Sequence, residues 1–126
     1  MSGLLAALRT GDADALNRLT ADDVAFHSPV TDYSGRANVV HLLRTIGDVL
    51  DTIEAEETFD APGVTVTLAK VSVGGRKADA LVREEVDADG ALSDLTLMLR
   101  PLDVLMAAVE LMGEALAADP LPEQLR

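Results

Sequence analysis

Residues 76–101 read RKADALVREEVDADGALSDLTLMLRP, and this stretch decides the predicted fold. Two runs rich in apolar residues flank a polar segment, residues 87–90, whose members tolerate turn conformations that bulky and β-branched residues resist. The stretch therefore predicts a long β-hairpin that ends at Pro101. Helices predicted on both sides of it need a surface to pack against, and the hairpin is the best candidate.

Length and charge limit the possible classes of protein. The chain has 126 residues, so we expect one domain over residues 1–126, with residues 119–126 as a loose tail. Its net charge of −12 argues against nucleic acid or an anionic membrane as partner. No cysteine is present, which excludes disulfides and thiolate chemistry. The chain shows no secretion signal and no apolar run of the ~20 residues that a membrane span needs, so we expect a cytoplasmic protein.

The first half of the chain predicts three helices and a strand. A first helix, capped by Ser2, carries three leucines, and a second, residues 13–19, is capped by Asp12. A short strand, residues 24–28, stops at Pro29 because proline cannot donate to a sheet. After a loop, Ser34 is expected to cap a long helix, residues 36–50, with an apolar stripe along one side.

The second half predicts a sheet and a final helix. Residues 51–60 form an acidic edge strand, and residues 64–73 form the strand before the hairpin. The apolar alternation of this strand slips near residues 69–70, which predicts a β-bulge there. Pro101 opens the last helix. The order predicts an α+β fold in which a curled antiparallel sheet forms a cone with helices on its concave face.

Four segments of the chain carry a resemblance to a known family. They are GDADAL (residues 11–16), ADDVAFHSP (21–29), Gly35-Arg36, and DGAL (89–92) leading to LMLRP (97–101). In this order and spacing they resemble the nuclear transport factor 2-like (cystatin-like) superfamily, in particular its SnoaL-like and ketosteroid-isomerase-like branches. The resemblance covers nearly the whole chain. It implies a conical pocket between the helices and the concave sheet, and a two-fold homodimer through the convex sheet face.

The catalytic groups of the steroid isomerases are not kept. The resemblance places their general-base aspartate on Ser28, their oxyanion-hole tyrosine near Leu4 and their protonated aspartate near Val82. Isomerisation needs a carboxylate to take the proton and acidic O–H donors to hold the enolate, which these three residues cannot supply. The limonene-epoxide-hydrolase branch is similar to the chain at Arg83 and Glu85. Its further aspartate falls near Leu97, so that set is incomplete too.

Strand alternation predicts which side chains face the pocket. If Val82 points inward, Glu84 does too, and so do alternate leucines of the last strand. His27 points outward. Glu84 is the one candidate acid/base, or else a rim carboxylate paired with a nearby arginine. We expect no metal and no cofactor. The predicted ligand-binding residues are Leu4, Phe26, Ser28, Tyr33, Val82, Glu84, Leu95, Leu97 and Leu99.

Three functions remain open from the sequence. The first is a protein that binds a small hydrophobic molecule in a mostly aliphatic pocket without a known reaction. The second is a SnoaL-like cyclase, isomerase or hydrolase with Glu84 as acid/base, assisted by Ser28 or His27. The third is a non-catalytic dimeric interaction module that works through the convex sheet face, with its outward residues Leu81, Arg83, Thr96 and Met98.

Overall fold

The structure is a computed structural model that describes residues 3–123. The predicted hairpin is confirmed as strands β5 and β6, which pair antiparallel across the turn. The elements in chain order are α1 (Gly3–Thr10), α2 (Ala13–Leu19), β1 (Thr20–His27), β2 (Asp32–Ser34), α3 (Arg36–Val49), β3 (Thr52–Ala61), β4 (Val64–Val73), β5 (Arg76–Val86), β6 (Leu92–Arg100) and α4 (Leu102–Ala118).

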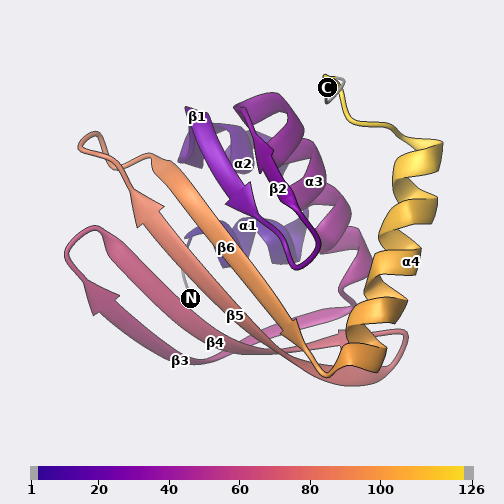
Figure 1. The fold of residues 1–126 in the computed structure, drawn as a ribbon. Helices are drawn as coiled ribbons and strands as arrows, with labels where there is room; N and C mark the ends of the chain where they lie inside the picture. Colours follow the sequence, from indigo (N-terminus) through magenta and orange to yellow (C-terminus); the bar gives the residue numbers. More distant parts are fainter. Residues whose placement is uncertain (1–2, 124–126) are drawn as a thin grey trace.

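The strands form one curled sheet in the order β2-β1-β6-β5-β4-β3. Helices α1, α2 and α3 lie against its concave face, and α4 stands at the end where β6 finishes (Figure 1). The predicted α+β cone is confirmed. One feature of the prediction was wrong, because β1 pairs with β6 in parallel and the sheet is therefore mixed. Parallel neighbours need a long connection, and the chain between these two strands provides it.

Two local predictions had different outcomes at helix starts. The Asp12 side chain accepts a hydrogen bond from the Ala15 N–H at 3.0 Å, so Asp12 caps α2 as predicted. Ser34 does not cap α3. It belongs to β2, a strand of three residues that is too short to show an alternation, and Gly35 takes the cap position at φ 91°. Glycine reaches this positive φ without strain, because it has no Cβ.

The predicted bulge lies on the neighbouring strand. β4 pairs with β5 without interruption, whereas the register shift occurs in β3 between Ala55 and Glu57. The slip in the β4 pattern has another cause. Val71 and Val73 are buried against the core, but Val66 and Leu68 fall on the opposite face of the strand. The convex face of the sheet thus carries apolar residues of its own.

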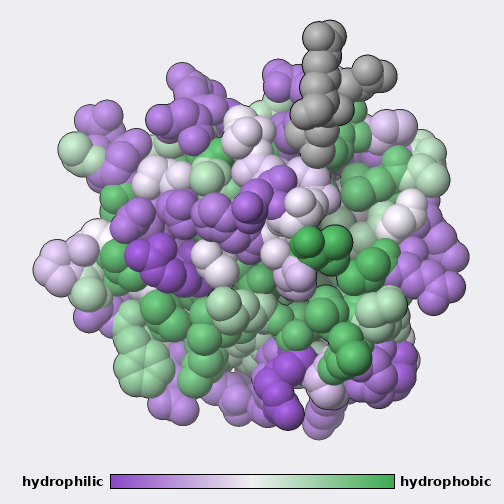
Figure 2. All heavy atoms as spheres, in the orientation of Figure 1, coloured by the Kyte–Doolittle hydropathy of each residue, from purple (hydrophilic) through white to green (hydrophobic). Residues whose placement is uncertain are grey.

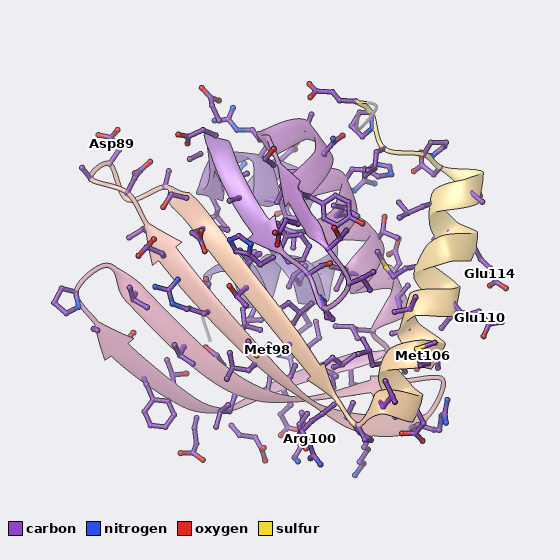
Figure 3. The ribbon with its side chains drawn as sticks, in the orientation of Figure 1. Asp89, Met98, Arg100, Met106, Glu110 and Glu114 are labelled. Atoms are coloured by element: carbon purple, nitrogen blue, oxygen red, sulfur yellow. The ribbon has the colours of Figure 1, made fainter. Side chains whose placement is uncertain are left out.

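Three outward-facing apolar side chains on neighbouring strands form what we term the outer apolar row: Leu68, Leu81 and Met98. They lie opposite one another on β4, β5 and β6. Phe59 on β3 extends the apolar surface, and the exposed fractions of Met98 and Phe59 are 57% and 55%. Figure 2 shows hydrophobic side chains gathered across this face. Figure 3 shows Met98 on the outer side of β6, away from the helices.

The described part of the predicted loose tail is held against α3. The Glu123 N–H donates to Asn38 Oδ1 at 3.0 Å, and His41 Nε2 lies 2.8 Å from the Asp119 carbonyl oxygen. Leu121 packs against the core. Residues 124–126 and the predicted Ser2 cap lie outside the described residues. Among residues 3–123, no helix has the length and apolar character to cross a membrane.

Candidate functional site

The cone contains a cavity of about 250 Å³ at its α4 end. Its walls come from β1, β2, α3, β5, β6, α4 and the β1–β2 loop. Ser28 and Tyr33 are its polar side chains, and none of the described lining residues is charged. The lining residues are Phe26, Ser28, Pro29, Val30, Tyr33, Leu42, Ile46, Val49, Leu50, Ala80, Leu97, Leu99, Leu105, Ala108, Val109, Met112, Gly113 and Leu116.

Small residues on α4 contribute to the open space of this cavity. Helix α3 presents Leu42, Ile46 and Val49 to it, a spacing that puts all three side chains on one helix face. Across the cavity, Ala108 and Gly113 of α4 contribute a methyl group and a hydrogen where larger side chains would fill the space. The α4 wall also carries the larger side chains of Leu105, Val109, Met112 and Leu116, so the void depends on the whole set of lining residues.

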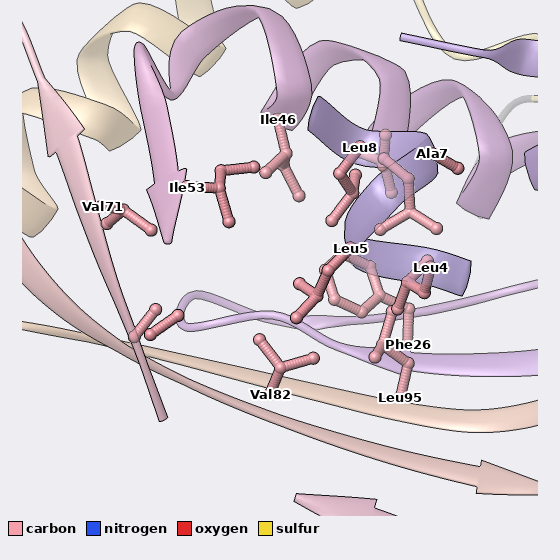
Figure 4. Packing of buried hydrophobic residues seen from close by; sticks show 14 of the residues in the cluster. Leu4, Leu5, Ala7, Leu8, Phe26, Ile46, Ile53, Val71, Val82 and Leu95 are labelled. Carbon is pink, nitrogen blue, oxygen red and sulfur yellow. The ribbon is translucent and has the colours of Figure 1, made fainter. Parts of the chain in front are cut away.

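A second, much smaller cavity of about 20 Å³ lies at the α1 end of the cone. Leu4, Leu5 and Leu8 of α1 fill this end, packed against residues such as Phe26 and Leu95 (Figure 4). The remaining space is of the order of one water molecule. The two cavities adjoin, because they share part of their walls: Phe26, Ile46, Leu50, Ala80 and Leu97.

The structure divides the predicted site residues between these two places. The larger cavity is lined by Phe26, Ser28, Tyr33, Leu97 and Leu99. The smaller one is lined by Leu4, Val82 and Leu95, with Phe26 and Leu97 shared.

Glu84 lies two residues beyond Val82 on β5, toward the hairpin turn, and among the described residues it lines neither cavity. The α4 wall was missing from the predicted site. Its sequence signal is the apolar spacing of Leu105, Ala108, Val109, Met112 and Leu116, which is equally typical of a helix face packed in the core.

The Ser28 hydroxyl is occupied by the loop that borders the cavity. It donates to the Thr31 carbonyl oxygen at 2.7 Å. It also accepts hydrogen bonds from the N–H groups of Val30 at 3.2 Å and Thr31 at 3.1 Å. Such a local side-chain turn fixes the backbone between two strands. Ser28, on which the resemblance places the base of the steroid isomerases, thus supports the loop.

Tyr33 supplies the other polar group of the lining. Its ring stacks on Phe26, with centroids 6.3 Å apart and planes at 26°. The two residues are direct neighbours in the β1–β2 pairing, which holds the ring in place. The hydroxyl forms no hydrogen bond within residues 3–123, so it is the hydroxyl of the lining with capacity to bind a ligand.

His27 lies on the outer side of the sheet, beside two carboxylates. Its Nδ1 is 2.7 Å from Asp32 Oδ1, and its Nε2 is 3.1 Å from Asp94 Oδ2. Hydrogen bonds first to Asp32 and then to Asp94 raise the pKa of His27 above its usual 6.5, since both nitrogens donate only in the protonated ring. His27 lines neither cavity, and within the described chain no three acidic or histidine side chains form a metal-binding group.

Comparison with known proteins identifies the fold. No protein-family model and no curated protein sequence matches the chain. An uncharacterised bacterial protein with a cystatin-like fold from Silicibacter pomeroyi superposes with a TM-score of 0.85, at 21% identity, over 89% of this chain and 81% of that one. A nuclear transport factor 2-like protein of unknown function from Cytophaga hutchinsonii gives a TM-score of 0.70, at 13% identity, over 81% and 88% of the two chains. The chain has the nuclear transport factor 2-like fold.

The structures similar to this chain include one named as a steroid isomerase. A steroid delta-isomerase from Pseudomonas aeruginosa superposes with a TM-score of 0.84, at 27% identity, over 90% of this chain and 85% of that one. The nuclear transport factor 2-like fold supplies the cone in both proteins. The chemistry of this chain has to be judged from its own cavity.

Proposed function

We propose that the protein binds a small hydrophobic molecule in the larger cavity and does not transform it. The observation that carries this proposal is a cavity of about 250 Å³ whose described lining contains no charged side chain. Transfer of apolar surface from water into such a cavity is favourable by roughly 25 cal/mol per Å². The Tyr33 hydroxyl can orient the bound molecule.

The same cavity argues against an enzyme of the isomerase, cyclase or hydrolase type. These reactions need an acid or base within hydrogen-bond reach of the substrate. Ser28 is engaged in its turn, and Glu84 borders neither of the two cavities in the described chain. The activity of the steroid delta-isomerase is therefore not part of our proposal.

A neutral fluorescent probe tests the proposal. We expect 1-naphthylamine, whose size suits the cavity, to bind the purified protein saturably, with one probe per chain. Ala108→Leu should weaken binding at least tenfold, because the added side chain enters the cavity. Ala6→Leu is the matched control on the exposed side of α1, and it should bind like the wild type. Absence of saturable binding in the wild type would show that the proposal is wrong.

We also propose that the outer apolar row is the interface of a cytoplasmic homodimer. A basic group, Lys70, Asp79 and Arg100, flanks the row on one side, with Asp79 paired to both cations. The strand order places Arg83, Glu85 and Asp94 on the other side, as an acidic group. Turning a second copy by 180° about an axis along the row places the basic group of each copy opposite the acidic group of the other. The apolar side chains then meet in the centre, as a self-complementary interface requires.

Light scattering at about 10 μM tests this interface. We expect twice the mass of the chain for the wild type and the mass of one chain for Met98→Glu, which buries a charge in the apolar row. Leu111→Glu places the same charge on α4, away from the sheet face, and should remain a dimer. A wild-type monomer at this concentration would contradict the proposal.

A further inference from the structure

Two glycines lie inside long helices, and only one of them is explained by packing. Gly47 belongs to α3 and Gly113 to α4, and glycine weakens a helix interior relative to alanine. A Cβ on Gly47 would lie 2.6 Å from the Leu8 carbonyl oxygen, so the close approach of α1 requires glycine there. A Cβ on Gly113 would meet no described atom within 4 Å, and its φ is not positive. Neither packing nor backbone conformation requires glycine at residue 113.

The position of Gly113 offers a reason. It lines the larger cavity and is itself exposed, so it lies at the opening. Val30, on the β1–β2 loop, also lines the cavity and has an exposed fraction of 65%. The opening thus lies between this loop and α4. A Cβ at residue 113 would border this opening without meeting a described atom within 4 Å, and a longer side chain would narrow the opening further.

We propose that Gly113 keeps this opening wide for an uncharged, mainly aliphatic ligand of about ten non-hydrogen atoms, whose polar end binds the Tyr33 hydroxyl. This inference rests on the proposed binding function and specifies its ligand.

The size of the ligand follows from the volume of the cavity. An apolar protein cavity of about 150 Å³ holds benzene, with its six carbon atoms. In proportion, about 250 Å³ holds roughly ten non-hydrogen atoms. The curved walls are built mostly from Leu, Val, Ile and Ala side chains, and these fit flexible aliphatic chains as well as rings.

The charge of the ligand follows from the lining. A buried carboxylate needs a cation or several N–H donors, and the described lining contains no Lys, Arg or His side chain. The net charge of −12 also disfavours the binding of an anionic ligand. A hydroxyl or carbonyl group needs one hydrogen-bond partner, and Tyr33 provides it.

Displacement of 1-naphthylamine by 1-decanol and by decanoate at pH 8 tests the ligand class. We expect 1-decanol to displace the probe at a concentration at least tenfold lower than decanoate. Tyr33→Phe should weaken the binding of 1-decanol about two- to tenfold, which is the range of one neutral hydrogen bond. The affinity for decane, which has no polar group, should stay unchanged. Equal displacement by decanoate, or an unchanged affinity of Tyr33→Phe for 1-decanol, would overturn the proposed ligand.

Variants on α4 test the opening. Gly113→Leu should reduce the association rate of 1-decanol at least tenfold, and Gly113→Ala should reduce it less. Ala118→Leu makes a comparable change at an exposed residue of α4, on the helix face of Leu111 and Glu114 and outside the lining, and should behave like the wild type. All three variants should fold, since leucine and alanine favour a helix over glycine. Wild-type rates for Gly113→Leu would overturn the role of Gly113. If the wild type does not bind the probe at all, the proposed function itself fails.

Discussion

The two ends of the cone share one sheet and one long helix, yet one end is filled and the other is open. At the α1 end, three leucines leave a void of about 20 Å³, whereas the α4 end holds about 250 Å³. At the filled end α1 contributes Leu4, Leu5 and Leu8, whereas the α4 wall of the open end includes the small residues Ala108 and Gly113 beside larger ones such as Met112. The nuclear transport factor 2-like fold therefore provides the walls, and the side chains that line each end decide how much of its space stays empty.

Leu5→Ala should cause the largest loss of stability among the variants that compare the two ends. Leu5 is 1% exposed in the filled end, so its truncation should lower the free energy of unfolding by about 2–5 kcal/mol. Leu105→Ala, at the open end, should cost less than half as much, because its side chain already borders empty space. Urea unfolding of both variants measures the difference. Equal costs would mean that the two ends are equally well packed.

Gly47→Ala should destabilise the protein by about 1–3 kcal/mol. The new methyl group would overlap the Leu8 carbonyl oxygen, which lies 2.6 Å away, and this outweighs the better helix propensity of alanine. Thermal unfolding followed by circular dichroism detects the change. An unchanged melting temperature would show that α1 can move away from α3 at little cost.

Gly113→Ala should stabilise the protein, in contrast to Gly47→Ala. A methyl group at this position meets no described atom within 4 Å, so the gain in helix propensity, about 0.5–1 kcal/mol, should appear as added stability. The same thermal unfolding experiment compares it directly with Gly47→Ala. A lower melting temperature would contradict the open geometry of the α4 end.

His27→Gln should produce the smallest effect, under about 1 kcal/mol, because the ion pairs of His27 are partly exposed. The pKa of His27 is raised in the folded protein, so its contribution to stability is fully present below pH 6.5 and is lost as the pH rises through the folded pKa. Urea unfolding from pH 5.5 to 9 should show that the difference between wild type and variant shrinks with pH. A difference that does not depend on pH would exclude the protonated pairing.

Sequence patterns predicted the elements and the face of each strand, but not the depth of each residue along the cone. The alternation of Val82, Leu95 and Leu97 correctly indicated the inner face. It could not tell that Leu97 borders the open end while Val82 and Leu95 lie in the filled end, because alternation has no information along the strand axis. In the sequence, the change from the outward Val66 and Leu68 to the inward Val71 and Val73 was interpreted as a bulge. A strand with apolar residues on both faces gives no single alternation from which the inner face can be predicted. The cavity itself depends on volumes contributed by four distant segments.

The parallel pairing of β1 with β6 has a consequence for how the chain reaches this structure. Strands β3 to β6 follow one another as antiparallel neighbours, so they can form early from short-range contacts. Phe26 of β1 must find Leu95 of β6, and this contact closes a loop of most of the chain. We expect hydrogen exchange to protect β4 and β5 before β1. Until β1 arrives, β6 has an unpaired edge with alternating leucines, and this is the interval in which a folding chain is most exposed to aggregation.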